Sequence, residues 1–181
     1  LSYSDLLLSV ATAQWKQLDA RQTIHTLVDE LNEIHPGFSF DKDFVLKSSL
    51  VLSDVTDVKF KVSNFDAKNM AIIENSWPKI ETALKTAVNL VGNMGFDRNT
   101  LTSNNATIPI AYHLLKLDFP KNYLDASAYK SEREIIRRWL LICLIKGVFG
   151  DQADTVLSSI RGELKDSHEN KKTEFPFDSI G

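Results

Sequence analysis

The basic residues near position 135 are the part of this sequence whose types and spacing best fit a binding surface. Arg133 and Arg137 are four residues apart, so they share one face of a helix, while Arg138 points elsewhere. Such a face can contact nucleic-acid phosphates or a partner domain. The alternative is a solvated helix surface on which Glu134 pairs with Arg138, four residues further on. The sequence leaves both interpretations open and gives these candidate contact residues: Lys130, Arg133, Arg137 and Arg138.

Other residue types that carry chemistry do not converge in the sequence. The four histidines are at positions 25, 35, 113 and 168, and only His25 has a carboxylate at helical spacing, that of Asp29. This pair fits a solvated helix face better than a metal site, and His113 fits the edge of a core. Cys143 stands inside an apolar run and is expected to be an inert core residue. We therefore predict no catalytic, metal-binding or cofactor-binding residue, and no cofactor.

Polar residues near helix ends offer capping rather than catalysis. Asp41, Asp43 and the carboxylates of residues 54–57 fit the stabilisation of helix termini. Thr102, Ser103, Asn104 and Asn105 precede a predicted helix, whose N-terminus could hold a phosphate. Capping explains this run equally well, because neither a Gly-rich turn nor a partner lysine accompanies it.

The composition bounds the class of protein. The chain has 181 residues, of which 43% are hydrophobic and 25% charged, as is ordinary for a globular domain. A net charge of −3 argues against a dedicated nucleic-acid-binding protein. The longest apolar run, residues 139–145, is far shorter than the roughly 20 residues of a membrane span. The single cysteine excludes an internal disulfide and favours a reducing, cytoplasmic location without a membrane partner.

Helix signals recur along the whole chain, and seven glycines with five prolines leave long uninterrupted stretches. Ser2 with Asp5 predicts a capped first helix, Asp19 caps a second, and Ser39 or Asp41 opens a third. The longest predicted helix covers residues 66–92 and carries a single apolar stripe: Met70, Ile73, Trp77, Ile80, Leu84, Ala87 and Val91. Pro78 lies inside it and is expected to kink it without splitting it.

The C-terminal half of the predicted helix 131–146 is apolar on every side, which is typical of a helix at the centre of a fold. We predict an all-α fold, an irregular bundle of about seven or eight helices around this buried helix near residues 131–146. Residues 1–166 form a single helical domain in this prediction. Residues 167–181 are expected to be a tail or linker toward a following domain, in which the Phe-Pro-Phe run 175–177 docks on a neighbouring surface.

Several stretches, taken together in order, resemble one family. These are residues 1–7, 11–15, 40–47, 101–105, 108–112, 136–140, 146–150 and 154–157. The pattern resembles the helical region of the bacterial GmrSD-like restriction proteins, domain-of-unknown-function family 262. Members open with a ParB- and sulfiredoxin-like nucleotidase domain marked by Asp-Gly-Gln-Gln-Arg, and many end with an HNH-type nuclease. Neither signature occurs in this sequence, so the resemblance assigns no catalytic residue to it.

The resemblance implies a non-catalytic helical module of a nucleotide-dependent restriction or phage-defence protein. Such a module supports the nucleotidase domain and couples it to a downstream domain, so its partners are other domains of the same protein. Because Leu1 stands directly before an amphipathic pattern, we expect a fragment of a longer protein. The fragment alone is not expected to be an enzyme, whereas the intact protein could be a nucleotide hydrolase and nuclease.

Two further expectations follow from this interpretation. Removal of a preceding domain predicts exposed apolar residues, above all on the first helix. The alternative function is a direct nucleic-acid-binding module, with DNA contacted by the basic helix around Arg133–Arg138, and a self-contained enzyme is a more remote third. The sequence does not fix an oligomeric state.

Overall fold

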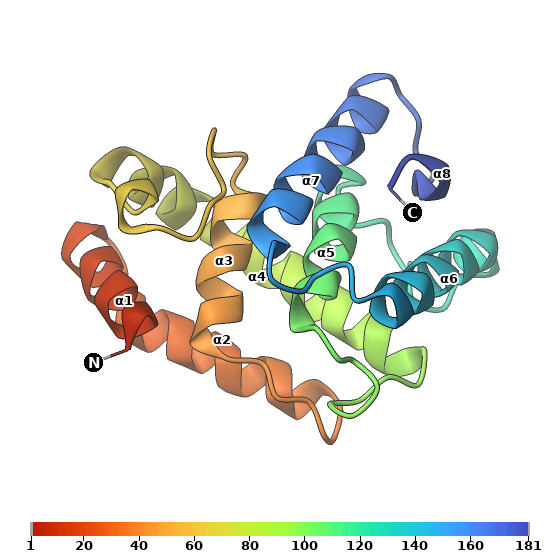
Figure 1. The fold of residues 1–181 in the computed structure, drawn as a ribbon, viewed down its shortest axis with the longest axis horizontal. Coiled ribbons are helices and arrows are strands. Elements are labelled where there is room, and N and C mark those ends of the chain that lie inside the picture. The colour runs from red at the N-terminus through yellow and green to blue at the C-terminus, as the bar shows by residue number, and fades with distance from the viewer. Residues whose placement is uncertain (1, 181) are drawn as a thin grey trace.

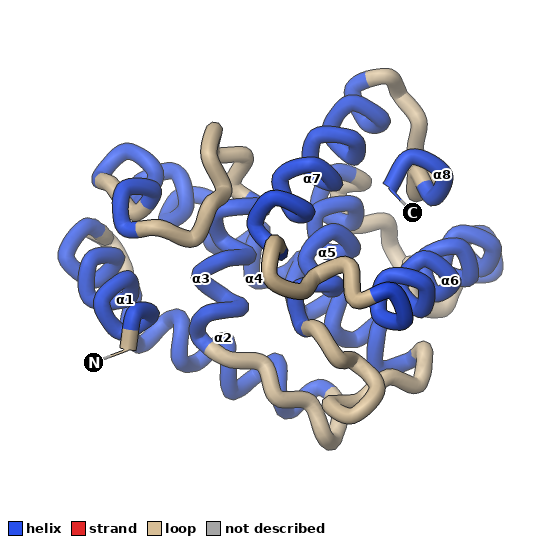
Figure 2. The backbone as a smooth tube through the Cα atoms, in the orientation of Figure 1, coloured by secondary structure: helices blue, strands red, loops and turns tan. Residues whose placement is uncertain are grey.

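The computed structural model describes residues 2–180 and contains helices and loops, with no strand in this range (Figure 2). The all-α prediction is confirmed. The helices are α1 (Tyr3–Gln14), α2 (Ala20–Ile34), α3 (Lys42–Leu52), α4 (Ala67–Asn93), α5 (Thr107–Lys116), α6 (Lys130–Lys146), α7 (Ala153–Glu169) and α8 (Phe177–Ile180). Single 3-10 turns stand at η1 (Val62–Asn64), η2 (Asn104–Ala106) and η3 (Ser127–Tyr129).

The N-termini of the first four helices are fixed by short polar side chains. Ser2 and Asp5 form a reciprocal capping box at α1. At α2, α3 and α4, the residues Asp19, Asp41 and Asp66 each accept a hydrogen bond from the backbone N–H three residues further on. These bonds satisfy N–H groups that have no partner within the helix. The caps predicted at Ser2 and Asp19 are therefore confirmed, Asp41 rather than Ser39 opens α3, and Asp66 is a further cap that the structure adds.

The centre of the fold is formed by α4 and α5. All seven residues of the predicted stripe on α4 are buried, and the helix runs uninterrupted through Pro78. On α5, the eight residues from Thr107 to Leu114 are all buried. This helix contacts α3, α4 and α7 and lies in the middle of the molecule (Figure 1). An element enclosed on several sides is expected to be largely apolar, as α5 is, with Thr107 and His113 as its buried polar residues.

The prediction that the helix at 131–146 is the buried centre is wrong. This helix, α6, lies at one edge of the molecule (Figure 1) and buries only Ile136, Trp139, Leu140 and Cys143. Its apolar run also faces outward, because Leu141 is 38% exposed and Ile145 is 82% exposed. In α6, the apolar residues on every side of the helix therefore form a buried core stripe and an exposed apolar patch.

The C-terminal segment of the polypeptide packs back against α6. Gly147, in the left-handed region at φ 63°, ends α6, and α7 extends to Glu169, beyond the predicted domain boundary at 166. Residues 170–180, which we name the C-terminal strap, then run to α8, which contacts α6 and α7 (Figure 1). Phe175 is 3% exposed and packs edge-to-face on Trp139, so the Phe-Pro-Phe run docks on this domain. Among the described helices, none has the length and apolarity to cross a membrane.

Candidate functional site

Arg133, one of the predicted contact residues, is bonded inside the domain. Its Nη1 atom donates hydrogen bonds to the carbonyl oxygens of Tyr123, at 2.6 Å, and Ala126, at 2.9 Å. Both carbonyls belong to the loop between α5 and α6. A guanidinium that satisfies two backbone acceptors in this way fixes a loop and has less capacity left for a phosphate.

The other three predicted contact residues point to two different surfaces. Lys130 and Arg137 line a hollow beside α4 together with Arg133, whereas Arg138 lies 5.7 Å from the ring centre of Phe177 in the strap. The structure therefore brings three of the four together and separates Arg138 from them. Glu134 pairs with Arg137 at 3.6 Å, so the expected pair between Glu134 and Arg138 is replaced by one at shorter spacing.

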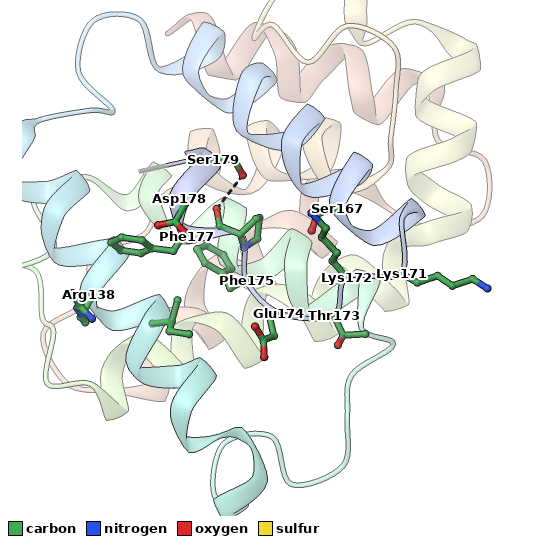
Figure 3. A pocket seen from close by; sticks show the side chains of 12 residues that line it. Arg138, Ser167, Lys171, Lys172, Thr173, Glu174, Phe175, Phe177, Asp178 and Ser179 are labelled. Atoms are coloured by element: carbon green, nitrogen blue, oxygen red, sulfur yellow. Dashed lines mark hydrogen bonds between the residues drawn. The ribbon is translucent and has the colours of Figure 1, made fainter.

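A cleft of about 720 Å³ lies between α6, the end of α7 and the strap (Figure 3). Arg138, Lys171 and Lys172 contribute positive charge to its walls, and Glu174 and Asp178 contribute negative charge. The hydroxyl of Ser167 is buried at this cleft and has no hydrogen-bond partner among the described residues. The walls of the cleft thus carry charges of both signs.

Beside this cleft, three side chains form a buried hydrogen-bonded chain. His113 is fully buried; its Nε2 atom lies 2.7 Å from Oε1 of Glu132, and its Nδ1 atom lies 3.0 Å from Nε2 of His168. Phe175, which also lines the cleft, packs edge-on against His113 with ring centres 5.2 Å apart. Since the carboxylate of Glu132 accepts only, Nε2 of His113 carries a hydrogen, and the two imidazoles share one further hydrogen between them.

The environment of these three hydrogen-bonded side chains disfavours a positive charge on His168. Burial lowers the pKa of His168 to about 4, and the neighbouring charges of His113 and Lys116 act in the same direction. Nδ1 of His113 and Nε2 of His168 are hydrogen-bonded to each other, so the two atoms are not arranged to bind a common ligand. Within the described part of the chain, no group of three His, Cys, Asp or Glu side chains could hold a metal ion.

Two groups of predicted caps have other roles. The carboxylate of Asp54 accepts hydrogen bonds from the Tyr112 hydroxyl, at 2.6 Å, and from Lys116, both on α5. These bonds lower the pKa of Asp54 although its burial opposes the shift. In the polar run 102–105, the Asn104 amide donates to the carbonyl of Ser39, and no side-chain cap exists at η2 or α5 among the described residues. The capping interpretation is therefore wrong for Asp54 and for the run 102–105, because Asp54 and Asn104 each tie distant segments together.

The remaining candidates keep the places that the sequence predicts, with one exception. His25 and Asp29 are exposed on α2, and Cys143 is buried, which raises the pKa of its thiol to about 11. A thiol in that state is a poor nucleophile at neutral pH. The exception is His113, which lies in the core rather than at its edge. Sequence reasoning missed its partners Glu132 and His168, since they are 19 and 55 residues away and no local spacing joins them.

Neither the protein-family models nor the curated protein sequences give a match to the chain. The described residues define an all-α domain with a buried His–His–Glu chain beside a cleft of mixed charge.

Proposed function

We propose that the chain is a non-catalytic helical module of a GmrSD-like, nucleotide-dependent restriction or phage-defence protein. In this role it supports a nucleotidase domain and couples it to a downstream domain. The proposal rests on the resemblance carried by the stretches named above. The structural observation that supports it best is an apolar surface on α1.

The outer face of α1 presents two large apolar side chains. Tyr3 is 50% exposed and Leu6 is 49% exposed, and their spacing of three residues puts them on one face. The buried apolar residues of this helix, Leu7, Leu8 and Ala11, pack into the core. Exposed apolar residues therefore occur on the first helix, and a preceding domain is our proposed explanation for them.

This apolar face is held in a fixed position. The ring of Tyr3 packs edge-to-face on Phe60, with centres 6.1 Å apart, and its hydroxyl accepts a hydrogen bond from the backbone N–H of Val62 at 3.2 Å. Val62 itself is 40% exposed beside it. A preorganised apolar surface loses little side-chain entropy on binding, which suits a permanent contact between domains.

The contacts of α6 favour this function over direct nucleic-acid binding. Arg133 is bonded to two carbonyls, and Arg138 lies over Phe177, apart from the other basic residues. A surface that reads phosphates needs cationic side chains with donors to spare. The basic helix has fewer of these than its sequence suggests.

The test begins with the gene upstream of Leu1, where an Asp-Gly-Gln-Gln-Arg motif is expected. The intact protein is then incubated with ATP, GTP, CTP and UTP in the presence of Mg²⁺, and phosphate release is measured beside that of the present chain. We expect release by the intact protein alone, and a several-fold loss with Leu6→Glu. Leu18→Glu, at a 44% exposed residue outside the α1 face, is the matched control. Phosphate release by the present chain, or a Leu6→Glu protein as active as the control, would contradict the proposal.

A further inference from the structure

A second unpartnered surface follows the outer side of α6. Two hollows of about 470 Å³ and 360 Å³ adjoin each other, since Met94 and Arg137 line both of them. One wall is α6 and the other is the C-terminal end of α4 with the loop that follows it. We name this surface the α6 groove. It lies at the opposite end of the molecule from α1 (Figure 1).

One end of the α6 groove is apolar. It is lined by Met94, Phe96, Leu141, Leu144 and Ile145. Ile145 leaves 82% of its surface exposed, the largest exposure among the large hydrophobic residues described. Covering such a side chain removes apolar surface from water, so the patch favours an apolar partner.

The other end of the α6 groove is basic. Lys130, Arg133 and Arg137 line it against a single carboxylate, that of Glu134. Arg133 is held by backbone carbonyls, and Arg137 lies 3.6 Å from Glu134 in an exposed pair of little strength. The N-terminus of α6, where Lys130 stands, adds the positive end of the helix dipole. Charge therefore changes along the groove from neutral at Ile145 to positive at Lys130.

We propose that the α6 groove binds an acidic amphipathic helix of a partner that is not a copy of this chain. The apolar residues of that helix cover Leu141 and Ile145, and its carboxylates pair with Arg137 and Lys130. The sixteen residues from Lys130 to Ile145 span roughly 22 Å, so about four turns of partner helix fill the groove. The inference is independent of the proposed function, which rests on the family resemblance and on the apolar face of α1.

The charge pattern disfavours a second copy of the chain as the occupant. In a twofold contact each residue near the axis meets its own counterpart. Arg137 stands near the middle of α6, so a symmetric contact along this helix brings the two Arg137 side chains together. Like charges at a desolvated contact cost several kcal/mol, as a general rule.

The test uses two designed peptides of about sixteen residues. Both carry leucine at alternating steps of three and four, and the remaining positions are glutamate in one and lysine in the other. Each peptide carries a fluorescein label, and its anisotropy is followed as the whole chain is added at about 50 mM salt, where exposed charges are weakly screened. We expect the glutamate peptide to bind and the lysine peptide to bind at least roughly tenfold more weakly.

Three variants separate the two parts of the α6 groove. Ile145→Ser is expected to weaken the binding of the glutamate peptide by roughly tenfold. Arg137→Glu is expected to weaken it by a similar factor and to bind the lysine peptide instead. Leu6→Ser, on the α1 face, is expected to change nothing. Ile145 and Arg137 are both exposed, so these variants keep the fold, which circular dichroism verifies.

Three outcomes would overturn the inference. The first is equal binding of both peptides or of neither, and the second is binding that Ile145→Ser leaves unchanged. The third is sedimentation equilibrium that shows a dimer broken by Ile145→Ser, since this result would assign the groove to a second copy of the chain.

Discussion

The Nδ1 atom of His113 lies 3.0 Å from Nε2 of His168, so one hydrogen serves two imidazole rings from different helices. His113 belongs to the central α5 and His168 to the last turn of α7. Because Glu132 of α6 bonds the far side of His113, this chain joins three helices through a single buried ring. The strap covers the ring through Phe175. Protonation of these hydrogen-bonded side chains therefore affects how strongly α5, α6, α7 and the strap pack together.

Acidification is expected to destabilise the fold before the carboxylates titrate. His168 takes up a proton near pH 6.5 in the unfolded chain and only near 4 in the folded one, so between these values the unfolded state holds more protons. Stability is then complete above about 6.5 and falls as the pH decreases toward 4. After allowance for partial solvent exposure, we expect a loss of roughly 1–2 kcal/mol in the free energy of unfolding between pH 7.5 and 5.

Urea unfolding at the two pH values measures this loss. His168→Gln removes the titrating group, so the variant is expected to lose less stability between pH 7.5 and 5 than the original chain. His25→Gln, on an exposed face, is the matched control and is expected to keep the full dependence. If the original chain and His168→Gln lose equal stability on acidification, the titrating group is not His168.

Glu74 is expected to be among the carboxylates whose loss of charge lowers the free energy of unfolding most. Its Oε1 atom accepts hydrogen bonds from the backbone N–H groups of Lys16, Gln17 and Leu18 at 3.1, 2.6 and 2.9 Å. These bonds connect α4 to the loop between α1 and α2, and they lower the pKa of Glu74 although its burial opposes the shift. Glu74→Gln keeps the size of the side chain and loses its charge, which we expect to cost about 1–3 kcal/mol of unfolding free energy. Glu81→Gln, which removes a partly exposed pair with Lys85, is expected to cost less than about 0.5 kcal/mol in the same urea titration.

Two helical glycines are expected to respond to alanine in opposite directions. A Cβ at Gly92 would lie 2.1 Å from Cδ2 of His35, whose ring packs edge-on against Phe38. Gly92→Ala therefore forces that ring to move and is expected to cost about 1–3 kcal/mol. At Gly162 of α7 a Cβ meets no described atom within 4 Å, so Gly162→Ala is expected to gain about 0.5–1 kcal/mol through helix propensity. Thermal melts compare the two variants. A Gly92→Ala variant that is more stable than the original chain would show that the His35 ring moves without a loss of stability.

The two arginines that share the outer face of α6 are expected to differ. Arg133→Ala leaves the carbonyls of Tyr123 and Ala126 without their donor and is expected to cost about 1–2 kcal/mol. Arg137→Ala removes only an exposed pair at 3.6 Å and is expected to stay within about 0.5 kcal/mol. Chemical denaturation measures both values. Equal stabilities of the two variants would mean that Arg133 does not hold the loop.

Local signals predicted most of the helices and the N-terminal caps of the first three. A cap such as Asp19 depends only on a side chain and an N–H three residues away, so the sequence contains the whole interaction. The same holds for Gly147, whose left-handed conformation ends α6. Local geometry was not sufficient at Asp54 and Asn104, because a short polar side chain near a helix end can equally well bond a distant segment.

The sequence by itself determined the helical class, the capped starts and the buried stripe of α4, because helix periodicity and capping are properties of neighbouring residues. Only the tertiary structure decided which apolar helix is central, since an all-round apolar surface can be enclosed, as in α5, or half exposed, as at Ile145 of α6. It also decided the roles of Arg133, His113 and Glu132. Their hydrogen bonds join groups far apart in the chain, and nothing in their local spacing encodes the packing that brings them together.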